Sequence, residues 1–353
     1  MIYAFDIIHP AHVHFFSNAI KKLLDRGDNV KVFSRKKELV CELLDEYRIK
    51  HDVLSRVMTG ITGLLYEMVI HQGRLLKKII KEKPDVIVAL GGPLCTHVAR
   101  LRQCPVAIFT DTHIAYMQNL ITLPFATRIF VPDCYPGPFY GFRRKFIKYA
   151  GYHELAYLHP KYFKPDPRIR DHLKLKQNES YSIVRFTAWK SSHDLTTSGL
   201  NTNRKQLLIQ ELLRFGRVFI SSEDELSDDL KTYEFPLPGS SMHDALAYAS
   251  LVVGESATMV SEAVVLGTRG IYISPVHRCY TDDQEANYQL ARTINPNLFD
   301  EILRTINDWY KGKAFQNITD NHHKLIESKI DVTEFIISSI TAMAKHRNIE
   351  IDS

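Results

Sequence analysis

The chain has 353 residues, 45% of them hydrophobic and 24% charged, with a net charge of +5. This length allows two domains with separate cores, and so mild a charge permits a phosphate-bearing partner without requiring one. No long basic run, RNA-binding motif or zinc-finger motif predicts nucleic-acid binding. No stretch approaches the roughly 18 apolar residues of a membrane span, and Asp6 interrupts the apolar start. We therefore expect a cytoplasmic protein whose sequence begins directly with a strand.

The first 160 residues alternate short apolar runs with segments of helical spacing. "IYAFDII" predicts a buried parallel strand, and residues 13–24 have the apolar spacing of a helix. Further strands are predicted at "NVKVFSR", "HDVLS", "DVIVAL", "PVAIFTD" and "ATRIFVP", with the longest helix at 64–82. This alternation predicts a doubly wound parallel sheet, whose ligand crevice should lie at the carboxyl ends of the strands.

The composition of the sequence changes after residue 160, and an α/β pattern then resumes. Residues 161–180 are rich in proline and charge, which indicates an interdomain linker. Strands follow at "YSIVRF", "RVFISS", "SLVVGES" and "RGIYIS", with helices near 203–215, 242–249 and 258–266, and the chain from about 284 is expected to be mainly helical. We therefore predict an N-terminal domain over 1–160, a linker over 161–180, a C-terminal domain over 181–330, and a helix over 331–353 that packs back on the N-terminal domain.

Three histidines crowd "HPAHVHFF", where the first strand gives way to the first helix. His12 and His14 are two residues apart, so on a helix they point in directions about 200° apart and do not converge on one ion. The five cysteines form no CxxC pair either, so we expect no metal site. A neutral imidazole facing the crevice can instead take a proton from a hydroxyl. His12 and His14 are candidate bases, with helix capping or packing as the alternative.

Two further features lie at predicted strand ends of the first half. In "FTDTHIAY", Asp111 either caps the next helix or serves as a crevice carboxylate that binds hydroxyls or acts as a base. The glycine pair of "VALGGPLCTHVARL" either lets a ligand approach the backbone or only makes a tight turn into a helix that starts at Pro93.

In the second half, "GESATMVSEAVVLGTRGIY" places small residues between a strand and a helix. The free amides of a first helical turn favour a phosphate, and Ser256 and Thr258 can add hydroxyl donors. Glu262, one turn further, can accept hydrogen bonds from ribose. An ordinary capped turn is the alternative. Arg185 near the end of an apolar strand needs either a carboxylate partner or a bound anion.

These segments, together with "FTDTHIAYMQNLITLPFA", "GYHELAYLHP" and "VRFTAWKSSHD", resemble a bacterial and archaeal GT-B-like family of unknown function. That family is related to GT-B glycosyltransferases and UDP-N-acetylglucosamine 2-epimerases. The resemblance covers most of the chain and implies an α/β, GT-B-like fold, with two Rossmann-like doubly wound domains facing across a cleft.

The resemblance also implies roles for individual residues. The pyrophosphate contacts would be Ser256, Ala257, Thr258 and Met259, the ribose ligand Glu262, and further ligand contacts Arg185, Ser191, Ser192 and His193. "HV" at His12 resembles the His-Val pair of a cell-wall N-acetylglucosaminyltransferase, which supports His12 as the base. Glu255 stands where relatives often have glycine, and its carboxylate opposes a phosphate there unless the side chain turns away.

The expected activity is transfer of a sugar from a UDP-linked donor to a hydroxyl of a glycan or lipid-linked acceptor, in the synthesis of surface polysaccharide or cell envelope. Neither metal nor cofactor is expected, since helix N-termini and basic groups stabilise the leaving diphosphate in GT-B enzymes and the nucleotide sugar is a substrate. The alternatives are a UDP-sugar 2-epimerase or hydrolase on the same fold, or a non-catalytic glycan-binding protein. The sequence predicts no oligomeric state.

Residues 60–80 and "YGFRRKFIKY" mix basic and apolar side chains. This mixture suits an ordinary basic surface, or a peripheral contact with the inner face of a membrane that carries lipid-linked acceptors.

Overall fold

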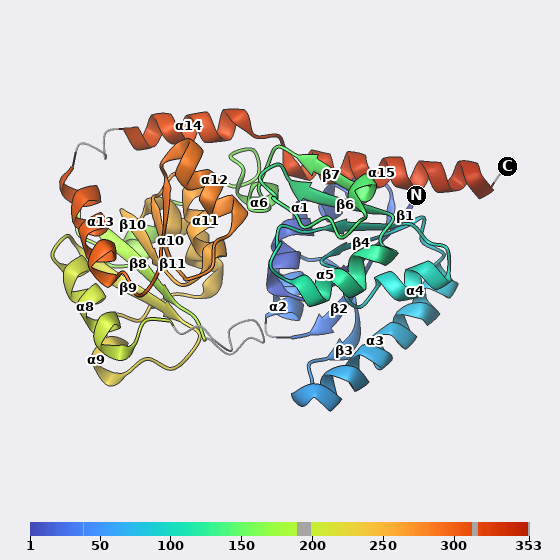
Figure 1. The fold of residues 1–353 in the computed structure, drawn as a ribbon, viewed down its shortest axis with the longest axis horizontal. Helices are drawn as coiled ribbons and strands as arrows, with labels where there is room; N and C mark the ends of the chain where they lie inside the picture. Colours follow the sequence, from blue (N-terminus) through green and yellow to red (C-terminus); the bar gives the residue numbers. More distant parts are fainter. Residues whose placement is uncertain (38, 189–198, 313–316, 352–353) are drawn as a thin grey trace. The chain divides into compact units, whose positions relative to one another are not determined.

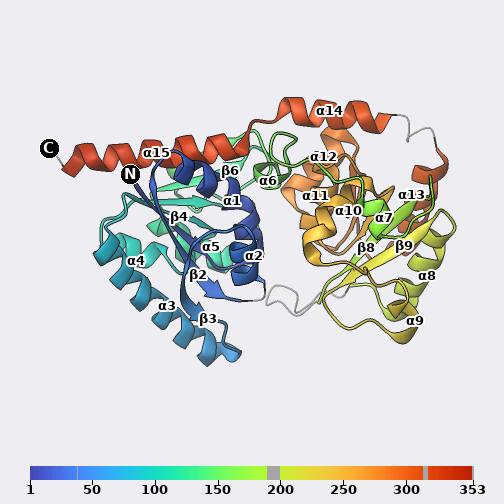
Figure 2. The ribbon, with the colours of Figure 1, turned by 180° about the vertical axis from the view of Figure 1, so that it is seen from behind.

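The computed structural model describes residues 1–37, 39–188, 199–312 and 317–351, which form two compact units (Figures 1 and 2). The first unit comprises Met1–Tyr157 and Ile330–Ser353, and the second comprises Leu158–Lys329. Each unit is built on one parallel sheet with helices between the strands. This confirms the predicted class of two doubly wound α/β domains. None of the helices in the described part of the chain has an apolar stretch of the length that a bilayer crossing needs.

The first sheet has seven strands in the order β3-β2-β1-β4-β5-β6-β7, and all neighbouring pairs are parallel. The strands are β1 (Ile2–Ile7), β2 (Asn29–Lys36), β3 (Asp52–Arg56), β4 (Val86–Leu90), β5 (Val106–Phe109), β6 (Arg128–Pro132) and β7 (Phe146–Tyr149). The direction of strand addition reverses between β1 and β4, so the carboxyl ends near this point can form a ligand crevice. The edge strand β7 was not predicted, because Ile147 and Lys148 in its middle are exposed.

Six helices cover the two faces of the first sheet (Figures 1 and 2). One face carries α1 (Pro10–Asp25), α2 (Val40–Glu46) and α15 (Val332–Ile351), and the other carries α3 (Gly60–Glu82), α4 (Thr96–Leu101) and α5 (Tyr116–Thr122). The short 3₁₀ helices are η1 (Leu123–Phe125) and η2 (Arg143–Lys145). Pro10 presets the first turn of α1, and the side chain of His9 caps it by accepting from the amide of Ala11 at 3.3 Å.

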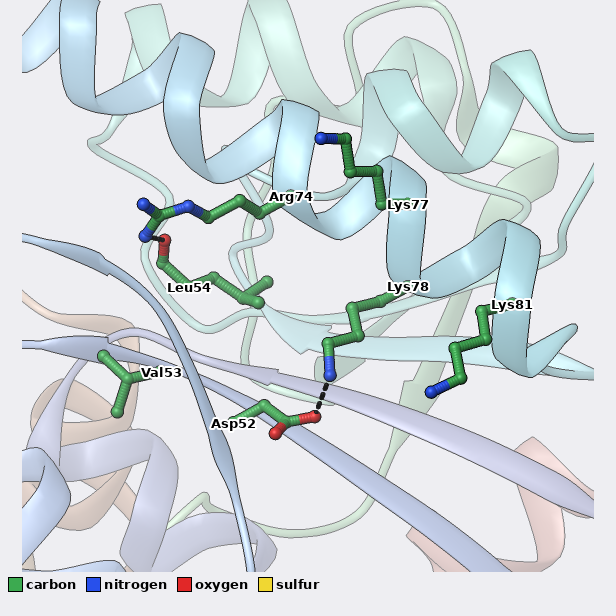
Figure 3. Close-up of a pocket in the computed structure, with 7 residues that line it drawn as sticks. All are labelled: Asp52, Val53, Leu54, Arg74, Lys77, Lys78 and Lys81. Carbon is green, nitrogen blue, oxygen red and sulfur yellow. Dashed lines mark hydrogen bonds and ion pairs between the residues drawn. The ribbon is translucent and has the colours of Figure 1, made fainter.

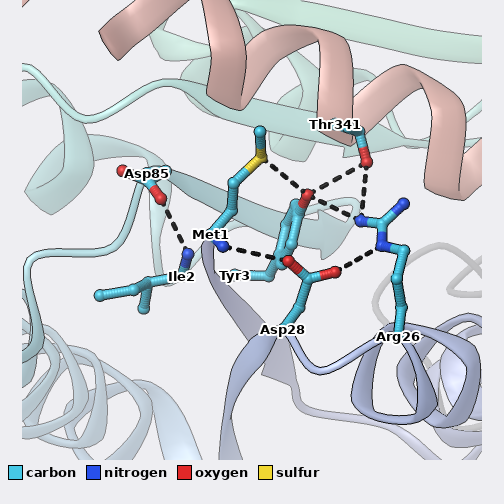
Figure 4. Close-up of polar contacts among 7 residues, drawn as sticks. All are labelled: Met1, Ile2, Tyr3, Arg26, Asp28, Asp85 and Thr341. Atoms are coloured by element: carbon cyan, nitrogen blue, oxygen red, sulfur yellow. Dashed lines mark hydrogen bonds and ion pairs between the residues drawn. The ribbon is translucent and has the colours of Figure 1, made fainter.

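The helix α15 belongs to the first unit although it is the last element of the chain. Its Thr341 hydroxyl lies 3.0 Å from the phenol oxygen of Tyr3 and accepts from Arg26 at 3.2 Å (Figure 4). At its start, the hydroxyl of Thr333 donates to the carbonyl of Ala156 at 2.7 Å. These contacts fasten the helix to β1, to α1 and to the segment after β7.

The second sheet has five parallel strands in the order β12-β11-β10-β8-β9. The strands are β8 (Tyr181–Phe186), β9 (Arg217–Ser222), β10 (Leu251–Gly254), β11 (Gly270–Ile273) and β12 (Ala291–Ile294). The helices are α6 (Leu155–Leu158), which spans the junction of the units, α7 (Ile169–His172), α8 (Thr202–Leu213), α9 (Asp228–Lys231), η3 (Gly239–Ser241), α10 (Met242–Tyr248), α11 (Ala257–Val265), α12 (Cys279–Tyr288), α13 (Phe299–Lys311) and α14 (Ile318–Ser328). The end of the chain from about 284 is mainly helical, as expected, with the short strand β12 added, in which an exposed Arg292 interrupts the apolar residues.

Residues 161–180, for which we expected a linker, fall within the second unit. Ile169 and Leu173 are buried there, and the amide of Asp166 donates to the carboxylate of Asp244 at 2.8 Å. This segment therefore packs against α10 before the second sheet begins.

Candidate functional site

The carboxyl ends of three strands in the first unit bring titratable side chains together. Asp111 follows β5 and His153 follows β7, and the Asp111 Oδ2 and His153 Nδ1 atoms lie 3.0 Å apart. The ring of His153 packs on Phe15 of α1, with 4.5 Å between the ring centroids. His12 lies one turn earlier on α1 and is near enough for a charge on His153 to lower its pKa. The structure thus groups His12 and Asp111 with a histidine that sequence reasoning did not assign to the site.

His12 is buried at this edge, with an exposed fraction of 8%. Burial is the main reason that its pKa falls from 6.5 to about 3, and the neighbouring His9 and His153 lower the pKa further. The backbone amide of Ile8 points at its Nδ1 atom at 3.5 Å. His12 is therefore a neutral imidazole near pH 7, and so low a pKa makes it a weak proton acceptor.

His14 points to a different set of groups. Its Nδ1 atom lies 2.9 Å from the phenol oxygen of Tyr47, and its ring stacks on Tyr157 with 5.4 Å between the centroids. Both contacts are with aromatic side chains, so the described surroundings of His14 support a packing role, which was one of the two alternatives left by the sequence.

Asp111 is engaged through both carboxylate oxygens. Oδ1 accepts from the hydroxyl of Thr112 at 2.9 Å, and Oδ2 faces His153. The next helix, α5, begins at Tyr116 and has no side-chain cap. The capping alternative for Asp111 is therefore not realised, and its carboxylate remains at the strand edge.

The glycine pair after β4 makes a tight turn. Gly91 and Gly92 have φ values of +71° and +63°, which glycine adopts at little cost. A Cβ atom on Gly92 would lie 2.4 Å from the side chain of Ile108. The helix α4 begins at Thr96 rather than at Pro93. Turn geometry and packing therefore account for both glycines.

His153 was missed because its strand was missed. It lies in "GYHELAYLHP", which contributed to the family resemblance, but β7 lacks the continuous apolar run of a buried strand. Without β7 there was no strand end to mark His153 as a crevice residue. The signal that could have found it is the short segment "FIKY", which ends four residues before His153 at the end of the first α/β pattern.

In the second unit, the predicted phosphate-binding residues form the start of α11. The Ser256 hydroxyl caps the helix by accepting from the amide of Met259 at 3.3 Å, and Ala257 is the first helical residue. A Cβ on Gly254 would lie 2.3 Å from the carbonyl oxygen of Arg185, so close packing of β10 on β8 requires this glycine. The first turn, from Ser256 through Thr258 to Met259, thus follows directly from the strand.

The carboxylate of Glu255 turns to the backbone of two other segments. Its Oε2 atom accepts from the amide of Thr187 at 3.0 Å, and Oε1 accepts from the amide of Leu200 at 2.7 Å. The residue is 5% exposed. The side chain therefore adopts the turned-away orientation that the sequence required for a phosphate site at this turn.

Glu262 and Arg185 both have partners within the second unit. The Glu262 Oε1 atom lies 3.1 Å from Nε2 of His243 on α10, and Glu262 is 8% exposed. Arg185 donates to the hydroxyl of Ser221 at 2.8 Å and to the carboxylate of Glu223 at 2.6 Å. Arg185 thus has the carboxylate partner that one of the two sequence hypotheses demanded.

The remaining predicted ligand contacts, Ser191, Ser192 and His193, lie outside the described residues. Within the described part of the chain, no group of three histidine, cysteine, aspartate or glutamate side chains is placed to hold a metal ion.

The chain belongs to the family described as "Protein of unknown function (DUF354)", whose family profile matches residues 2–328. This is the GT-B-like family of unknown function that the sequence motifs resemble. No curated protein matches the sequence.

Solved structures share the fold over nearly the whole chain. UDP-GlcNAc 2-epimerase from Neisseria meningitidis, bound to UDP-GlcNAc, is 12% identical with a TM-score of 0.69, over 97% of this chain and 100% of that chain. S. aureus MnaA, solved with UDP, is 11% identical with a TM-score of 0.69, over 96% of each chain. Acinetobacter baumannii MurG is 14% identical with a TM-score of 0.62, over 97% of this chain and 100% of that one. These similarities show that the chain has the α/β, GT-B-like fold that its sequence predicts.

Proposed function

We propose that this protein is a metal-independent glycosyltransferase that moves a sugar from a UDP-linked donor to a hydroxyl of a glycan or lipid-linked acceptor. The observation that carries the proposal is the Asp111–His153 pair beside the neutral His12 at the strand ends of the first unit. Transfer to a hydroxyl needs a group that accepts one proton while the donor bond breaks, and a histidine held by a carboxylate supplies it.

The second unit supplies features suited to the nucleotide. The start of α11 offers backbone amides and the hydroxyls of Ser256 and Thr258 to a diphosphate, and the helix N-terminus stabilises the charge on the leaving UDP. Glu262, one turn into the helix, accepts from the ribose hydroxyls. Glu255 does not oppose this, since its charge is held by two backbone amides. Solved proteins of this fold bound to UDP or UDP-GlcNAc support the choice of a uridine nucleotide.

Titration calorimetry of the whole chain with UDP, GDP and CMP tests this proposal first. We expect binding of UDP in preference to the other two, and then release of UDP from UDP-GlcNAc that depends on an added glycan or lipid-linked acceptor. Failure to bind any of the three nucleotides would overturn the proposal.

A UDP-sugar 2-epimerase or hydrolase is the second candidate. A carboxylate and a histidine in contact can also serve elimination and re-addition, and several solved proteins with this fold are named as UDP-GlcNAc 2-epimerases. This candidate predicts that UDP-GlcNAc alone is epimerised or hydrolysed, with no acceptor. Analysis of the products with and without acceptor separates the two activities.

The surface of α3 supports a peripheral contact with an anionic membrane, where a lipid-linked acceptor would reside. Its first half exposes four large apolar side chains, Leu64, Leu65, Tyr66 and Val69, each at least half accessible to solvent. Its second half and β3 line a cavity of about 410 Å³ with Arg74, Lys77, Lys78 and Lys81, where Lys78 pairs with Asp52 at 2.6 Å (Figure 3). A peripheral membrane site combines apolar side chains that insert into the bilayer interface with cationic side chains that bind lipid phosphates.

Co-sedimentation with vesicles tests the membrane contact. We expect the chain to bind vesicles of phosphatidylcholine with phosphatidylglycerol more tightly than phosphatidylcholine alone, and the double substitution Leu64→Ser with Val69→Ser to weaken that binding. Leu207→Ser is the matched control, because Leu207 is 49% exposed on α8 of the second unit. Equal sedimentation of all three proteins would remove the membrane contact from the proposal.

A further inference from the structure

His153 is fixed in place on several sides. It follows β7 and is 7% exposed, and its ring lies against Phe15 of α1. Its Nδ1 atom faces the Asp111 carboxylate at 3.0 Å. Its carbonyl accepts from the amide of Ala156, so the backbone is also held. Neither the ring nor the main chain is free to turn.

The second ring nitrogen of His153 is different. Among the residues that the structure describes, no group makes a hydrogen bond to its buried Nε2 atom. Buried polar atoms are nearly always paired, and an unpaired one costs free energy, so such an atom calls for an explanation. A substrate hydroxyl that binds at this nitrogen would provide one.

The histidines of this unit differ in how their buried ring nitrogens are paired. The Nδ1 atom of His97 also has no hydrogen bond among the described residues, and its ring packs on Phe125. His71 of α3 is fully buried, yet its Nδ1 atom lies 2.9 Å from the hydroxyl of Ser55 and its Nε2 atom 3.1 Å from Asp6. The Ser55 hydroxyl also donates to Glu67, which is held by Arg35 at 2.7 Å. Both ring nitrogens of His71 therefore have partners, so this network stabilises the fold and His71 has no nitrogen left for a ligand.

The carboxylate sets which nitrogen of His153 carries the proton. Asp111 accepts from Nδ1–H, so the neutral ring has its lone pair on Nε2. His12 is placed differently, because the amide of Ile8 points at its Nδ1 atom and its ring also has a hydrogen bond to the backbone of Asp6. His153 is therefore the histidine whose Nε2 lone pair is arranged to accept a proton.

We propose that His153, rather than His12, takes the proton from the acceptor hydroxyl, with Asp111 as its positioning residue. This inference rests on the proposed transferase function. The hydroxyl oxygen forms a bond to the anomeric carbon as its proton moves to Nε2 of His153. The bond from that carbon to the diphosphate oxygen breaks, and UDP leaves with the electron pair. Asp111 stabilises the imidazolium until the proton passes to solvent.

The orientation of His153 can be measured without turnover. In the whole chain labelled with ¹⁵N-histidine, the signals that disappear in His153→Gln belong to His153. We expect them to show protonated Nδ1 and unprotonated Nε2 in the neutral ring, and we expect Asp111→Asn to change this pattern. A neutral His153 that carries its proton on Nε2 would overturn the inference.

Turnover of UDP-GlcNAc in the presence of acceptor gives the second measurement. We expect His153→Gln to lower kcat by about 100-fold or more, the usual range for general acid–base groups, with the Kd for UDP changed less than about twofold. The loss of rate on the acid side of the wild-type pH profile should vanish in this variant. Asp111→Asn, which keeps the side-chain size, should lower kcat less. His172→Gln on α7 is the control, because its side chain is exposed in the second unit.

These outcomes separate the inference from the proposed function. A wild-type chain that neither binds UDP nor releases it from UDP-GlcNAc would sink the proposed function, while the tautomer of His153 would still be decided by the ¹⁵N signals. A chain that turns over UDP-GlcNAc equally well with and without the His153→Gln substitution would keep the proposed function and remove His153 from it.

Discussion

The polar side chains at the carboxyl ends of the parallel strands differ between the two units. At the edge of the first sheet, a buried neutral His12 lies near the pair of a partly exposed Asp111 and a buried His153, and one ring nitrogen of His153 has no hydrogen-bond partner among the described residues. At the edge of the second sheet, Glu255 is held by two backbone amides and Arg185 by Glu223. The side chains at the first edge are therefore suited to proton transfer. Those at the second edge hold the backbone around them in place.

This difference separates two uses of a carboxylate at a strand end. Glu255 satisfies amides that would otherwise lack partners, so its charge maintains the shape of the second unit. Asp111 orients an imidazole, so its charge sets where a proton can go. Charge reversal or removal should therefore act on stability in one unit and on chemistry in the other.

Glu255→Ala gives the largest effect that we expect. The substitution leaves the amides of Thr187 and Leu200 without their carboxylate, and hydrogen bonds to a charged group contribute about 1.5–3 kcal/mol each, so the free energy of unfolding should fall by about 3–6 kcal/mol. Both tryptophans, Trp189 and Trp309, belong to the 158–329 stretch of the chain, so urea unfolding followed by their fluorescence measures this loss in the second unit.

Glu255→Gln is the matched control, because its one carbonyl oxygen can still accept from one of the two amides. Its loss of stability should be roughly half as large. If Glu255→Ala unfolds at the same urea concentration as the wild type, the carboxylate does not maintain the second unit and the contrast between the edges fails.

The pH dependence of the first unit gives the next effect. The pKa of His12 is about 3 in the folded chain, whereas an exposed imidazole has a pKa of 6.5, so below pH 6.5 the unfolded chain binds a proton that the folded chain does not. The free energy of unfolding therefore falls as the pH falls, by about 2 kcal/mol from this one group between pH 6.5 and about pH 5. His12→Asn should lack this part of the loss.

Hydrogen exchange of the α1 amides at pH 7 and about pH 5 measures the difference between the wild type and His12→Asn. The difference in amide protection between the wild type and His12→Asn should become smaller at the lower pH, because the wild type loses more stability than the variant. His172→Asn changes an exposed position, so the difference in amide protection between this variant and the wild type should be the same at both pH values. If the difference in amide protection between His12→Asn and the wild type does not change with pH, then His12 is not buried as a neutral ring.

Glu262→Ala gives the smallest effect and tests the second edge as a nucleotide site. Loss of a charged acceptor for the ribose hydroxyls should weaken UDP binding by about tenfold, which corresponds to about 1.4 kcal/mol. Calorimetry with UDP measures this change. Glu327→Ala, at an exposed position of α14 in the same unit, is the control. Unchanged affinity in Glu262→Ala would remove this residue from the proposed donor site.

Parts of the site followed from local sequence signals. His12 and Asp111 were predicted because each follows an apolar run that reads as a buried strand. Ser256 was predicted as part of the small-residue turn, and it caps α11. Arg185 was recognised as needing an anionic partner, but only the fold identifies Glu223, which is 38 residues away in the sequence.

His153 could not be predicted in the same way, since its place depends on β7. Strand β7 joins the sheet through backbone pairing with β6, although its middle residues face solvent. Backbone hydrogen bonds of this kind do not depend on apolar side chains, so the apolar pattern of the sequence indicates such a strand only weakly. The orientation of Glu255 was hidden for a similar reason, because its partners are main-chain amides at positions 187 and 200.

By itself, the sequence determined the two parallel α/β units, the strand ends at which polar residues gather, and the family resemblance, because apolar periodicity and short motifs are local properties of a chain. Only the tertiary structure decided which of those polar residues meet. Contacts such as Asp111 with His153, or Glu262 with His243, join segments that are far apart in sequence, and their distances follow from strand order and packing. The chemistry of a histidine depends on those distances, since its neighbours set both its charge and the nitrogen that carries its proton.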